Sequence, residues 1–276
     1  MKKFKVGLQL FSVRDEMAQD FEGTLQKVKD MGYDYVEFAG FYEKTAEEVK
    51  AILDKIGLTA ISAHQGNQLF VEQGKAAIDY LAKIGVKYCA IPWFGLDKWQ
   101  EDFDGTIKAF TEFSAALKEA GIKLCYHNHE FELTNDIDGV HLLDKLYNTL
   151  STDIIDPELD TCWVHYAGEN PADYIEKYAG RVEIVHLKDF VCEKLGNGPV
   201  YDLIDKNGKS TKDMSKEETG FKFVPIGTGR QDFPAILAAC EKSGTEYVIV
   251  EQDQSLDRDP LDAVKMSRDY LKSLGL

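Results

Sequence analysis

Short apolar segments with the composition of buried strands recur along the whole chain, separated by longer amphipathic segments. These apolar segments are rich in β-branched and aromatic residues and are bounded by glycine or polar residues. Such runs are typical of the parallel strands of an α/β protein, which are buried on both faces. We predict eight strands, at 6–11, 35–39, 59–63, 88–92, 123–127, 154–160, 182–187 and 247–251.

The amphipathic segments repeat their apolar residues with the period of an α-helix. Several of them end in glycine shortly before the next strand, at Gly32, Gly57, Gly85 and Gly121. Glycine suits the left-handed conformation that commonly ends a helix. The predicted helices cover 21–31, 46–56, 72–84, 103–120, 139–148, 171–178, 233–243 and 259–274.

Eight strand–helix units with short connections predict a parallel sheet that closes on itself. We therefore expect an α/β fold, a single-domain (β/α)8 TIM barrel over residues 1–276. An open, doubly wound sheet is the second choice, because no Gly-x-Gly-x-x-Gly motif follows the first strand. The glycines at 227 and 229 come late in the chain and lack the third glycine of that motif.

One segment, from about 190 to 223, interrupts this regular alternation. It is charged and rich in glycine, and it contains the turn-forming pairs Asn197-Gly198 and Asn207-Gly208. A solvated insertion is one interpretation. Because the segment directly follows the strand that contains His186, we also expect it to lie over the C-terminal face of the barrel, where it could act as a lid.

The negative net charge of the chain argues against one class of ligand, the nucleic acids. The 276 residues carry a formal net charge of −16, which disfavours a nucleic-acid partner, because phosphate backbones require clustered lysine and arginine. No apolar stretch approaches the roughly 20 residues that span a bilayer, and we expect no secretory signal in the first residues. The five cysteines form no Cys-x-x-Cys pair, which favours buried, reduced thiols and a cytoplasmic location.

The candidate chemistry lies where the predicted strands end. His127, Asp160, His186 and Glu251 each lie at or beside the carboxyl end of a predicted strand. Side chains at these ends of a barrel meet in one place, even when they are far apart in the sequence. Two imidazoles and two carboxylates suit a divalent ion such as Mn²⁺, Zn²⁺, Co²⁺ or Fe²⁺. These four residues are therefore the predicted metal site.

Each of these residues also has a purely structural interpretation. A single histidine at a strand end is more often a hydrogen-bonded core residue than a ligand, and Asp160 could simply cap a helix that begins at Thr161. Four such positions on the last four strands make independent structural roles the weaker interpretation. His141 and His165 have no such companions, and we assign them structural roles.

A divalent ion at this place would polarise a carbonyl and a neighbouring hydroxyl, which stabilises an enediolate and eases proton transfer at carbon. A carboxylate that acts as the base there requires a moderately raised pKa. A phosphorylated ligand would need backbone N–H groups or an arginine near the mouth. Arg230 and the turn at 227–229 are candidates, although a structural turn is the better interpretation of that motif.

Several motifs together resemble those of the sugar phosphate isomerase/epimerase superfamily, the xylose isomerase-like barrels. This resemblance covers nearly the whole chain and is more specific for the superfamily than for a substrate. It implies one divalent metal, for which Asp160, His186 and Glu251 match three of the family's four ligands. The motifs are Gly-Leu-Gln-Leu-Phe-Ser at 7–12, Gly-Tyr-Asp-Tyr-Val-Glu at 32–37, Ser-Ala-His at 62–64, His-Leu-Lys-Asp at 186–189 and Pro-Ile-Gly-Thr-Gly at 225–229.

The chain departs from the family pattern at two positions. His127 stands where many members have a glutamate ligand, and Trp163 stands where the epimerases tend to have a substrate-binding histidine. In the epimerases two glutamates exchange protons on opposite faces of the sugar, so the loss of one argues against that symmetric mechanism. A histidine-rich fifth strand is closer to the inosose dehydratase-like branch, which acts on keto-sugars.

The resemblance also implies roles for individual residues. Glu251 would be a metal ligand and the base, and His127 would be either a ligand or a partner acid/base. The other residues expected around the substrate are Gln9, Glu37, His64, Trp93, His129 and Lys188. For Trp93, an apolar wall for a sugar face and a plain packing role are equally good interpretations.

The main functional hypothesis is a metal-dependent sugar isomerase or epimerase that works through an enediolate, with Mn²⁺ as first choice and Zn²⁺, Co²⁺, Fe²⁺ or Mg²⁺ as alternatives. A dehydratase acting on a keto-sugar or keto-inositol is the second hypothesis. A non-catalytic sugar-binding or partner-dependent subunit is the third, and a DNA-repair phosphodiesterase is disfavoured by the acidic charge. The expected partner is a small sugar or keto-polyol, and whether the chain forms a homo-oligomer stays open.

Overall fold

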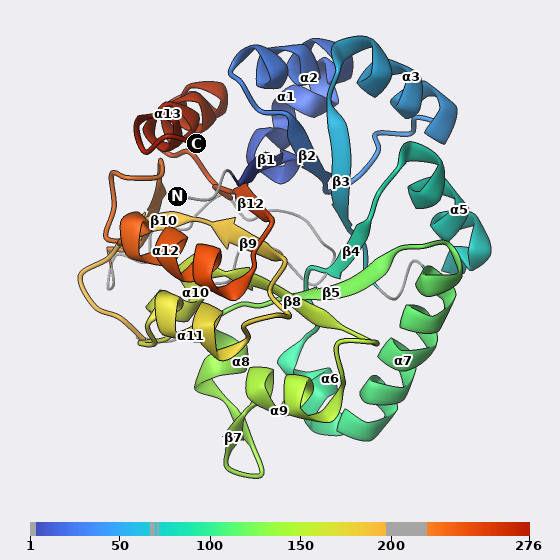
Figure 1. Ribbon diagram of the computed structural model, residues 1–276, viewed down its shortest axis with the longest axis vertical. Coiled ribbons are helices and arrows are strands. Elements are labelled where there is room, and N and C mark those ends of the chain that lie inside the picture. Colours follow the sequence, from blue (N-terminus) through green and yellow to red (C-terminus); the bar gives the residue numbers. More distant parts are fainter. Residues whose placement is uncertain (1–3, 67–69, 71, 197–219) are drawn as a thin grey trace.

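The computed structural model describes residues 4–66, 70, 72–196 and 220–276. Eight parallel strands close into a barrel, with β1 hydrogen-bonded to β2 on one side and to β12 on the other (Figure 1). This confirms the predicted (β/α)8 TIM barrel. The barrel strands, in order around it, are β1 (Lys5–Gln9), β2 (Tyr35–Phe38), β3 (Thr59–His64), β4 (Tyr88–Ile91), β5 (Lys123–His127), β8 (Asp156–Asp160), β9 (Ile184–Leu187) and β12 (Tyr247–Val250).

Helices surround the barrel on its outside, one after each barrel strand (Figure 1). They lie where the helical periodicity predicted them, with shifts of a few residues at their ends. The two largest shifts are at the third connection, where α5 begins after Gly74, and at the fifth, where a small hairpin precedes α9. The outer helices are α2 (Phe21–Asp30), α3 (Ala46–Ile56), α5 (Lys75–Ile84), α7 (Phe103–Glu119), α9 (Leu142–Thr149), α11 (Pro171–Lys177), α12 (Phe233–Ser243) and α13 (Pro260–Ser273).

Local sequence signals fix the ends of several of these helices. Thr45 and Glu48 form a capping box in which each side chain binds the other residue's backbone N–H at the start of α3. The same helix ends at Gly57, whose φ of 78° lies in the left-handed region that favours glycine. Gly85 ends α5 in the same way with a φ of 90°. These caps return the chain to the barrel within a few residues.

Short helical turns at the carboxyl ends of strands escaped the sequence analysis. They are too brief to show a helical period, because each spans about one or two turns. The 3-10 turn η1 begins directly after β1, and α10 begins directly after Asp160. These elements are η1 (Leu10–Val13), α1 (Arg14–Gln19), α6 (Leu96–Glu101), α8 (Phe131–Thr134) and α10 (Thr161–Tyr166).

Strand alternation divides the core into two layers. Outward-facing residues such as Leu8, Val36 and Val185 pack against the helices in the main apolar cluster. Inward-facing residues such as Ile61, Cys125 and Ile249 fill the lower part of the barrel. Above that inner layer, towards the carboxyl ends of the strands, the inward positions become polar.

The predicted insertion is described only at its two ends. β10 (Asp189–Val191) pairs with β11 (Lys222–Val224) in antiparallel fashion, and Phe190, Phe221 and Phe223 join Trp163 in a small aromatic cluster. Residues 197–219, including both Asn-Gly pairs, lie outside the described residues. The expected lid over the barrel mouth therefore stays a prediction. The second small hairpin joins β6 (Asp136–Ile137) to β7 (Val140–His141).

The cysteines follow the expected pattern. Four of the five are buried, Cys192 is partly exposed, and none of the five forms a disulfide. Within the described residues, no helix is both long and apolar enough to cross a membrane.

Candidate metal centre and active site

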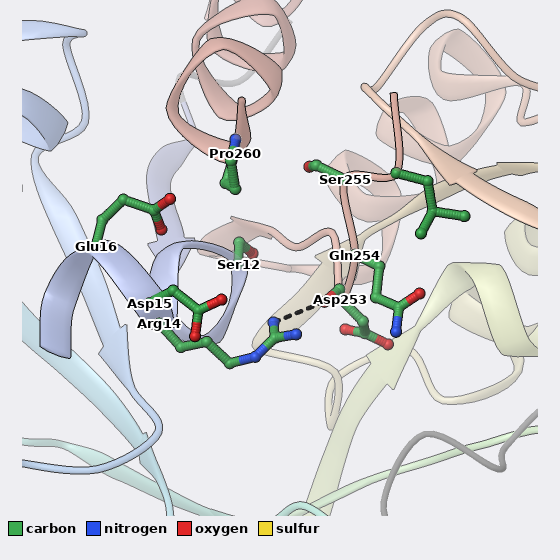
Figure 2. A pocket seen from close by; sticks show the side chains of 9 residues that line it. Ser12, Arg14, Asp15, Glu16, Asp253, Gln254, Ser255 and Pro260 are labelled. Carbon is green, nitrogen blue, oxygen red and sulfur yellow. Dashed lines mark hydrogen bonds between the residues drawn. The ribbon is translucent and has the colours of Figure 1, made fainter. Parts of the chain in front are cut away.

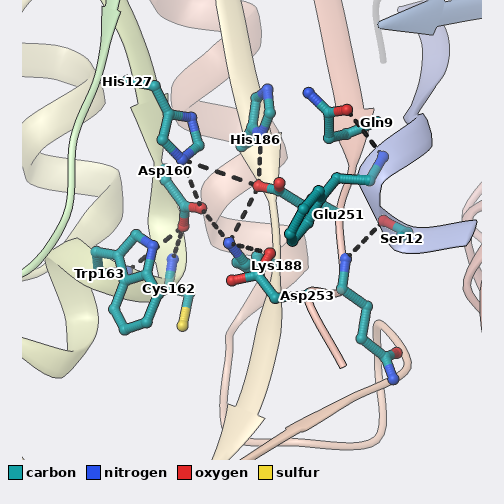
Figure 3. Close-up of polar contacts among 12 residues, drawn as sticks. Gln9, Ser12, His127, Asp160, Cys162, Trp163, His186, Lys188, Glu251 and Asp253 are labelled. Carbon is teal, nitrogen blue, oxygen red and sulfur yellow. Dashed lines mark hydrogen bonds and ion pairs between the residues drawn. The ribbon is translucent and has the colours of Figure 1, made fainter. Parts of the chain in front are cut away.

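The four residues of the predicted metal site lie together at the carboxyl ends of consecutive barrel strands. His127 ends β5, Asp160 ends β8, His186 lies in β9 and Glu251 follows β12 (Figure 3). One ligand atom from each lies within 4.8 Å of the others, and all four side chains are buried. We call these four residues the upper cluster. The parallel register brings them together, because it places every inward-facing strand end at the same mouth.

The contacts within the upper cluster converge on a single carboxylate oxygen. His186 Nδ1 is 2.9 Å from Glu251 Oε2, and His127 Nε2 is 3.9 Å from the same oxygen. His127 Nε2 is also 3.6 Å from Asp160 Oδ2. Asp160 uses its other oxygen to cap α10, where Oδ1 accepts from the backbone N–H of Cys162 at 2.7 Å. The structural and metal-ligand interpretations of Asp160 are thus compatible, since they involve different oxygens.

Lys188 adds an amino group to this cluster. Its Nζ lies 3.2 Å from Asp160 Oδ2, 3.0 Å from Glu251 Oε2 and 2.9 Å from Asp253 Oδ1 (Figure 3). The ammonium also lies 5.2 Å from the ring centroid of Trp163. Only 1% of Lys188 is exposed, so its charge acts on the carboxylates rather than on solvent. The sequence identified Lys188 as a pocket residue but not this role among three carboxylates.

A second set of ionisable residues lies directly below the upper cluster. Glu37 on β2, His64 on β3 and Glu158 on β8 form what we call the lower cluster. His64 Nε2 is 2.6 Å from Glu158 Oε1 and 3.0 Å from Glu37 Oε1. Gln9 Nε2 donates a 2.6 Å hydrogen bond to Glu37. The lower cluster also contacts His127 and His186 of the upper cluster.

Glu158 is the functional candidate that the sequence analysis missed. It is fully buried, and a signal for it was present, because it lies two residues before Asp160 and strand alternation therefore turns both inward. Only Asp160, the last residue of that strand, was predicted as a site residue. Its neighbours Pro157 and Leu159 point to the opposite face of the strand.

The neighbouring charges shift the pKa values of the histidines in different directions. Burial lowers the pKa of His64, but the charges of Glu37 and Glu158 outweigh it and raise that pKa to about 10. The pKa of His186 is likewise raised well above its ordinary value, since burial is outweighed by Glu37, Glu158 and Glu251. Burial and the neighbouring imidazoles hold the pKa of His127 well below its ordinary value. His127 is therefore a neutral imidazole with a free lone pair at neutral pH.

The pKa values of the two carboxylates in the upper cluster are also shifted in opposite directions. Burial raises the pKa of Asp160, only partly offset by Lys188. Burial acts in the same direction on Glu251, but Lys188 and His186 outweigh it and hold the pKa of Glu251 below its ordinary value. The sequence-based argument required a raised pKa for a base at this place. In the arrangement described here Glu251 is a stable anion, which suits a metal ligand.

The donor set fits a divalent ion. Two imidazole nitrogens and two carboxylates are ligands that ions such as Mn²⁺ and Zn²⁺ accept in proteins. Asp160 Oδ2 is buried and makes no hydrogen bond to the described residues. Negative charge is in excess here, because five buried carboxylates face the ammonium group of Lys188 and the two imidazoles whose pKa values are raised, so a further cation would relieve their repulsion. The carboxylates are Glu37, Glu158, Asp160, Glu251 and Asp253.

A cavity of about 190 Å³ opens above the upper cluster. Of the predicted substrate-binding residues, His64, Trp93 and His129 line it, together with His127 and Glu251 of the upper cluster. Trp93 is 41% exposed and stands edge-on to His129, with 4.9 Å between the ring centroids. The remaining lining residues are Phe11, Ala39 and Pro92. The cavity thus combines apolar walls with a few polar groups, as small-molecule sites do.

The other predicted substrate-binding residues lie outside this lining. Gln9 and Glu37 are fully buried and hydrogen-bonded to each other. Lys188 is held among carboxylates, as described above. Among the described residues, Glu251 is the one carboxylate that lines the cavity.

A second cavity, of about 380 Å³, lies beside the mouth between α1 and the segment after β12 (Figure 2). Arg14, Asp15, Glu16, Asp253 and Gln254 are among the residues that line it. The Arg14 guanidinium donates to the backbone carbonyls of Phe11 and Asp253, so its charge is already engaged. With three carboxylates around one engaged arginine, this cavity is a poor site for a phosphate.

The turn at 227–229 has a structural role, as its better interpretation predicted. Asp189 accepts hydrogen bonds from the backbone N–H groups of Gly227 at 3.0 Å and Gly229 at 2.8 Å. Arg230 donates to the carbonyl of Cys192. The amide groups that could have held a phosphate therefore bind a carboxylate of the protein itself. His141, paired with Asp136, and His165, beside Gln231, also lie outside the clusters.

Comparison with known proteins places these features in a family. The sequence profile described as "Xylose isomerase-like TIM barrel" matches residues 25–274. An inosose dehydratase from Clostridium beijerinckii is 24% identical over 280 residues, which cover 91% of this chain and 89% of that protein.

Solved structures show the same fold. A sugar phosphate isomerase/epimerase from Parabacteroides distasonis superimposes with a TM-score of 0.77 at 22% identity, covering 98% of each chain. The IOLI protein, whose crystal structure contains a bound zinc atom, superimposes with a TM-score of 0.71 at 14% identity, covering 98% of this chain and 97% of that one.

Proposed function

The chain belongs to the xylose isomerase-like TIM barrel family, a family of enzymes, and from this we propose that it is a divalent-metal-dependent enzyme that removes a proton next to the ketone of a small keto-sugar or keto-polyol. One observation carries the proposal. Two imidazoles and two carboxylates lie within 4.8 Å of one another, and His127 and Glu251 of this set line a cavity of about 190 Å³. This combination supports catalysis on a small ligand.

The ion would be held by His127, Asp160, His186 and Glu251. When bound, it supplies Lewis-acid polarisation of the ketone oxygen, which makes the neighbouring C–H group more acidic. Mn²⁺ is our first choice, because carboxylates and imidazoles in equal number suit a borderline-hard ion, and Zn²⁺ is the main alternative. The zinc in the IOLI structure supports the place of the ion in this fold rather than its identity here.

Glu251 is the proposed base. It is the carboxylate that lines the cavity, and its three close contacts, to His127, His186 and Lys188, all fall on Oε2. Oε2 would therefore face the ion, and Oε1 would take the proton from carbon. Because its pKa lies below the ordinary value, proton removal by Glu251 depends on the increased acidity of the substrate.

We favour dehydration as the overall reaction. Glu251 takes the proton from the carbon next to the ketone, and the C–H electron pair moves into the enolate. The enolate then reforms the ketone while the C–O bond at the next carbon breaks, and the leaving hydroxyl takes a proton and departs as water. His64, which lines the cavity and is held by Glu37 and Glu158, would supply that proton. One carboxylate base and one imidazole acid suffice for this reaction.

Isomerisation or epimerisation is the second candidate. The cavity favours it through His129, a further imidazole on the wall of the cavity that could return the proton to a different position. Symmetric exchange between two carboxylates is not supported, because His127 occupies the position of the second glutamate. The inosose dehydratase relative supports the first candidate, at an identity too low to fix the substrate.

The test begins with metal content and proton exchange. Purified protein should contain about one divalent ion per chain, and keto-inositols or ketoses incubated in D2O should either lose water or gain deuterium next to the ketone, measured by mass spectrometry and NMR. Glu251→Gln should lose proton exchange, and His186→Ala should lose the ion. Loss of water identifies a dehydratase, and deuterium gain without loss of water identifies an isomerase or epimerase.

Two controls separate the site from the scaffold. Glu246→Gln removes a carboxylate at the other end of the β12 region, where Glu246 pairs with Lys5, and should keep both the ion and the activity. His141→Ala removes a partly exposed histidine of the β6–β7 hairpin and should do the same. Wild-type protein without an ion, even after reconstitution, would contradict the proposal and favour a non-catalytic sugar-binding barrel.

A further inference from the structure

Three imidazoles converge on one oxygen of the buried Glu158. Glu158 Oε1 lies 2.6 Å from His64 Nε2, 3.2 Å from His186 Nε2 and 3.3 Å from His127 Nδ1. The other oxygen, Oε2, is 3.4 Å from the hydroxyl of Ser62. Glu158 therefore contacts both histidines of the upper cluster without belonging to that cluster.

Glu37 supports the same arrangement from the opposite side of the barrel. Its Oε1 lies 2.9 Å from His186 Nε2 and 3.0 Å from His64 Nε2. Gln9 holds the carboxylate in place through the 2.6 Å hydrogen bond from its amide. Both carboxylates are fully buried, so they cannot turn away to solvent.

The two shared histidines face the two clusters with opposite ring nitrogens. His186 turns Nδ1 to Glu251 above and Nε2 to Glu37 and Glu158 below. His127 turns Nε2 to Asp160 and Glu251 above and Nδ1 to Glu158 below. His127 Nδ1 and His186 Nε2 are buried and make no hydrogen bond within the described residues, although carboxylate oxygens of the lower cluster lie 2.9 to 3.3 Å away. Their nearest polar neighbours are thus the carboxylates below them.

This geometry distinguishes between two uses of the lower cluster. It could hold a second ion, because His64, His127, Glu158 and His186 also converge within 4.8 Å. A neutral imidazole, however, has one lone pair and one N–H group. Two ions at once would require both His127 and His186 to lose their remaining proton. A carboxylate that accepts the N–H group of a metal-bound histidine needs no such change.

We infer that Glu158, together with Glu37, is a positioning pair: when an ion is bound above, these carboxylates accept the lower N–H groups of His127 and His186 and so keep the upper nitrogens turned towards that ion. This inference rests on the metal site of the proposed function and adds to it the residues that orient its histidines. Carboxylates in this position fix the tautomer and the ring orientation of a ligand and increase its basicity. Glu158 serves both histidines at once.

The experiment measures ion affinity and stoichiometry with Mn²⁺, Zn²⁺ and Co²⁺ as probes, by competition with a chelator. Glu158→Gln should bind the ion about 10- to 100-fold more weakly than wild type, the usual loss when such a partner is removed. The absorption bands of bound Co²⁺ should shift as well, because the imidazoles are no longer held in one orientation. Glu158→Asp, which keeps a carboxylate, should recover part of the affinity.

Asp156→Asn is the matched control. Asp156 is a buried carboxylate on the same strand and the same inward face as Glu158, but it contacts Lys123 and Arg181 at the other end of the barrel. It should lower stability and leave the ion affinity and the Co²⁺ spectrum unchanged. If Glu158→Gln does not fold, Glu37→Gln tests the same inference through His186 alone.

The outcomes separate the inference from the proposed function. One ion per wild-type chain with unchanged affinity in folded Glu158→Gln and Glu37→Gln would overturn the inference and leave the metal site intact. Two ions in wild type, one of them lost in Glu158→Gln, would overturn it in favour of a second ion. No ion in wild type would overturn the proposed function and the inference together.

Discussion

The two ends of β8 carry aspartates on the same inward face, and their surroundings differ sharply. At the N-terminal end Asp156 has two cations of its own. It forms an ion pair with Lys123 and another with Arg181, with 3.2 Å between Asp156 Oδ1 and Arg181 Nε, and it accepts from Thr152 at 2.9 Å. Lys5 and Glu246 form a further ion pair at this end of the barrel, and Lys123 also lies 3.5 Å from Glu183.

At the C-terminal end Asp160 shares a single lysine with two other carboxylates. Lys188 lies within 3.2 Å of Asp160, Glu251 and Asp253, and Asp160 Oδ2 makes no hydrogen bond within the described residues. A buried carboxylate without its own cation is costly in the folded protein. Asp156 is thus matched by cations at the lower end, whereas the carboxylates of the mouth share theirs, which supports the proposed ion at that place.

The largest expected effect comes from replacing the two aspartates in turn. Asp160→Asn should lower activity by a factor of about 10³ or more and abolish stoichiometric ion binding, because it removes an anionic ligand. Asn can still cap α10, so the ion-free variant should unfold no more easily than wild type. Ion content and thermal unfolding of the ion-free protein measure both effects.

Asp156→Asn should behave in the opposite way. It should retain the ion and lower the free energy of unfolding by about 3 kcal/mol, because Lys123 and Arg181 lose their shared partner. Urea unfolding of the two variants under the same conditions tests the comparison directly. Equal losses of stability in Asp156→Asn and in ion-free Asp160→Asn would contradict it.

Glu132 adds a third case to the comparison of Asp156 with Asp160. It is a buried carboxylate whose hydrogen-bond donors are neutral. It accepts from the hydroxyl of Tyr126 at 2.6 Å and from the backbone N–H of His129 at 2.8 Å. Burial raises its pKa to about 8, although both hydrogen bonds act to lower it. The folded protein therefore keeps this proton between about pH 4.5 and 8, where the unfolded chain has lost it.

Because the folded state binds the extra proton, Glu132 should make stability fall as the pH rises from about 4.5 towards 8. The loss attributable to this carboxyl should be on the order of 4 kcal/mol by pH 8. Urea unfolding at several pH values, compared between wild type and Glu132→Gln, measures it. The variant should show a flatter pH dependence, and parallel curves would contradict the assignment.

Removal of the ion tests whether the carboxylates at the barrel mouth need a bound cation for stability. A chelator should lower the unfolding temperature of wild type, and restoring free ion to about 100 times its dissociation constant should return about 2.7 kcal/mol of stability. Asp160→Asn should show no such response. A wild-type unfolding temperature that is insensitive to both treatments would show that the mouth carboxylates are compensated without a bound ion.

The smallest expected effect concerns the rim of the cavity. Trp93→Ala should raise KM about tenfold by removing an apolar wall, and should change the free energy of unfolding by less than about 1 kcal/mol, because Trp93 is 41% exposed. Steady-state kinetics with the substrate found in the screen, together with urea unfolding, separates binding from packing. Unchanged KM with a large loss of stability would assign Trp93 to packing alone.

Some features of the site could be predicted from local sequence. The residues at the strand ends, His127, Asp160, His186 and Glu251, were predicted correctly as neighbours, because parallel strands bring their carboxyl ends to one mouth. His64, Trp93 and His129 line one cavity, and their predicted role in substrate binding stays a prediction. Glu158 was not predicted, because only Asp160, the last residue of the same strand, was considered as a ligand.

Other features of the site could not be predicted, because they depend on distances between residues that are far apart in the sequence. Lys188 was expected in the substrate pocket and instead lies among three carboxylates, because Asp253 turns back towards it after β12. The direction of the pKa shift of Glu251 follows from that lysine and from His186, which lie 63 and 65 residues away in the sequence. A short helix such as α10 also leaves no periodic signal.

The sequence by itself determined the eight strands, their order and the alternation that turns every second side chain inward, because period and capping are local properties of the chain. The tertiary structure alone decided which inward charges meet. The register of the strands sets Glu158 opposite His127 and Asp160 opposite His186. Asp156, two residues earlier on β8, lies beside its own cations, Lys123 and Arg181. Charge pairing depends on distances of a few ångströms across the closed barrel, and only the closure of the barrel sets those distances.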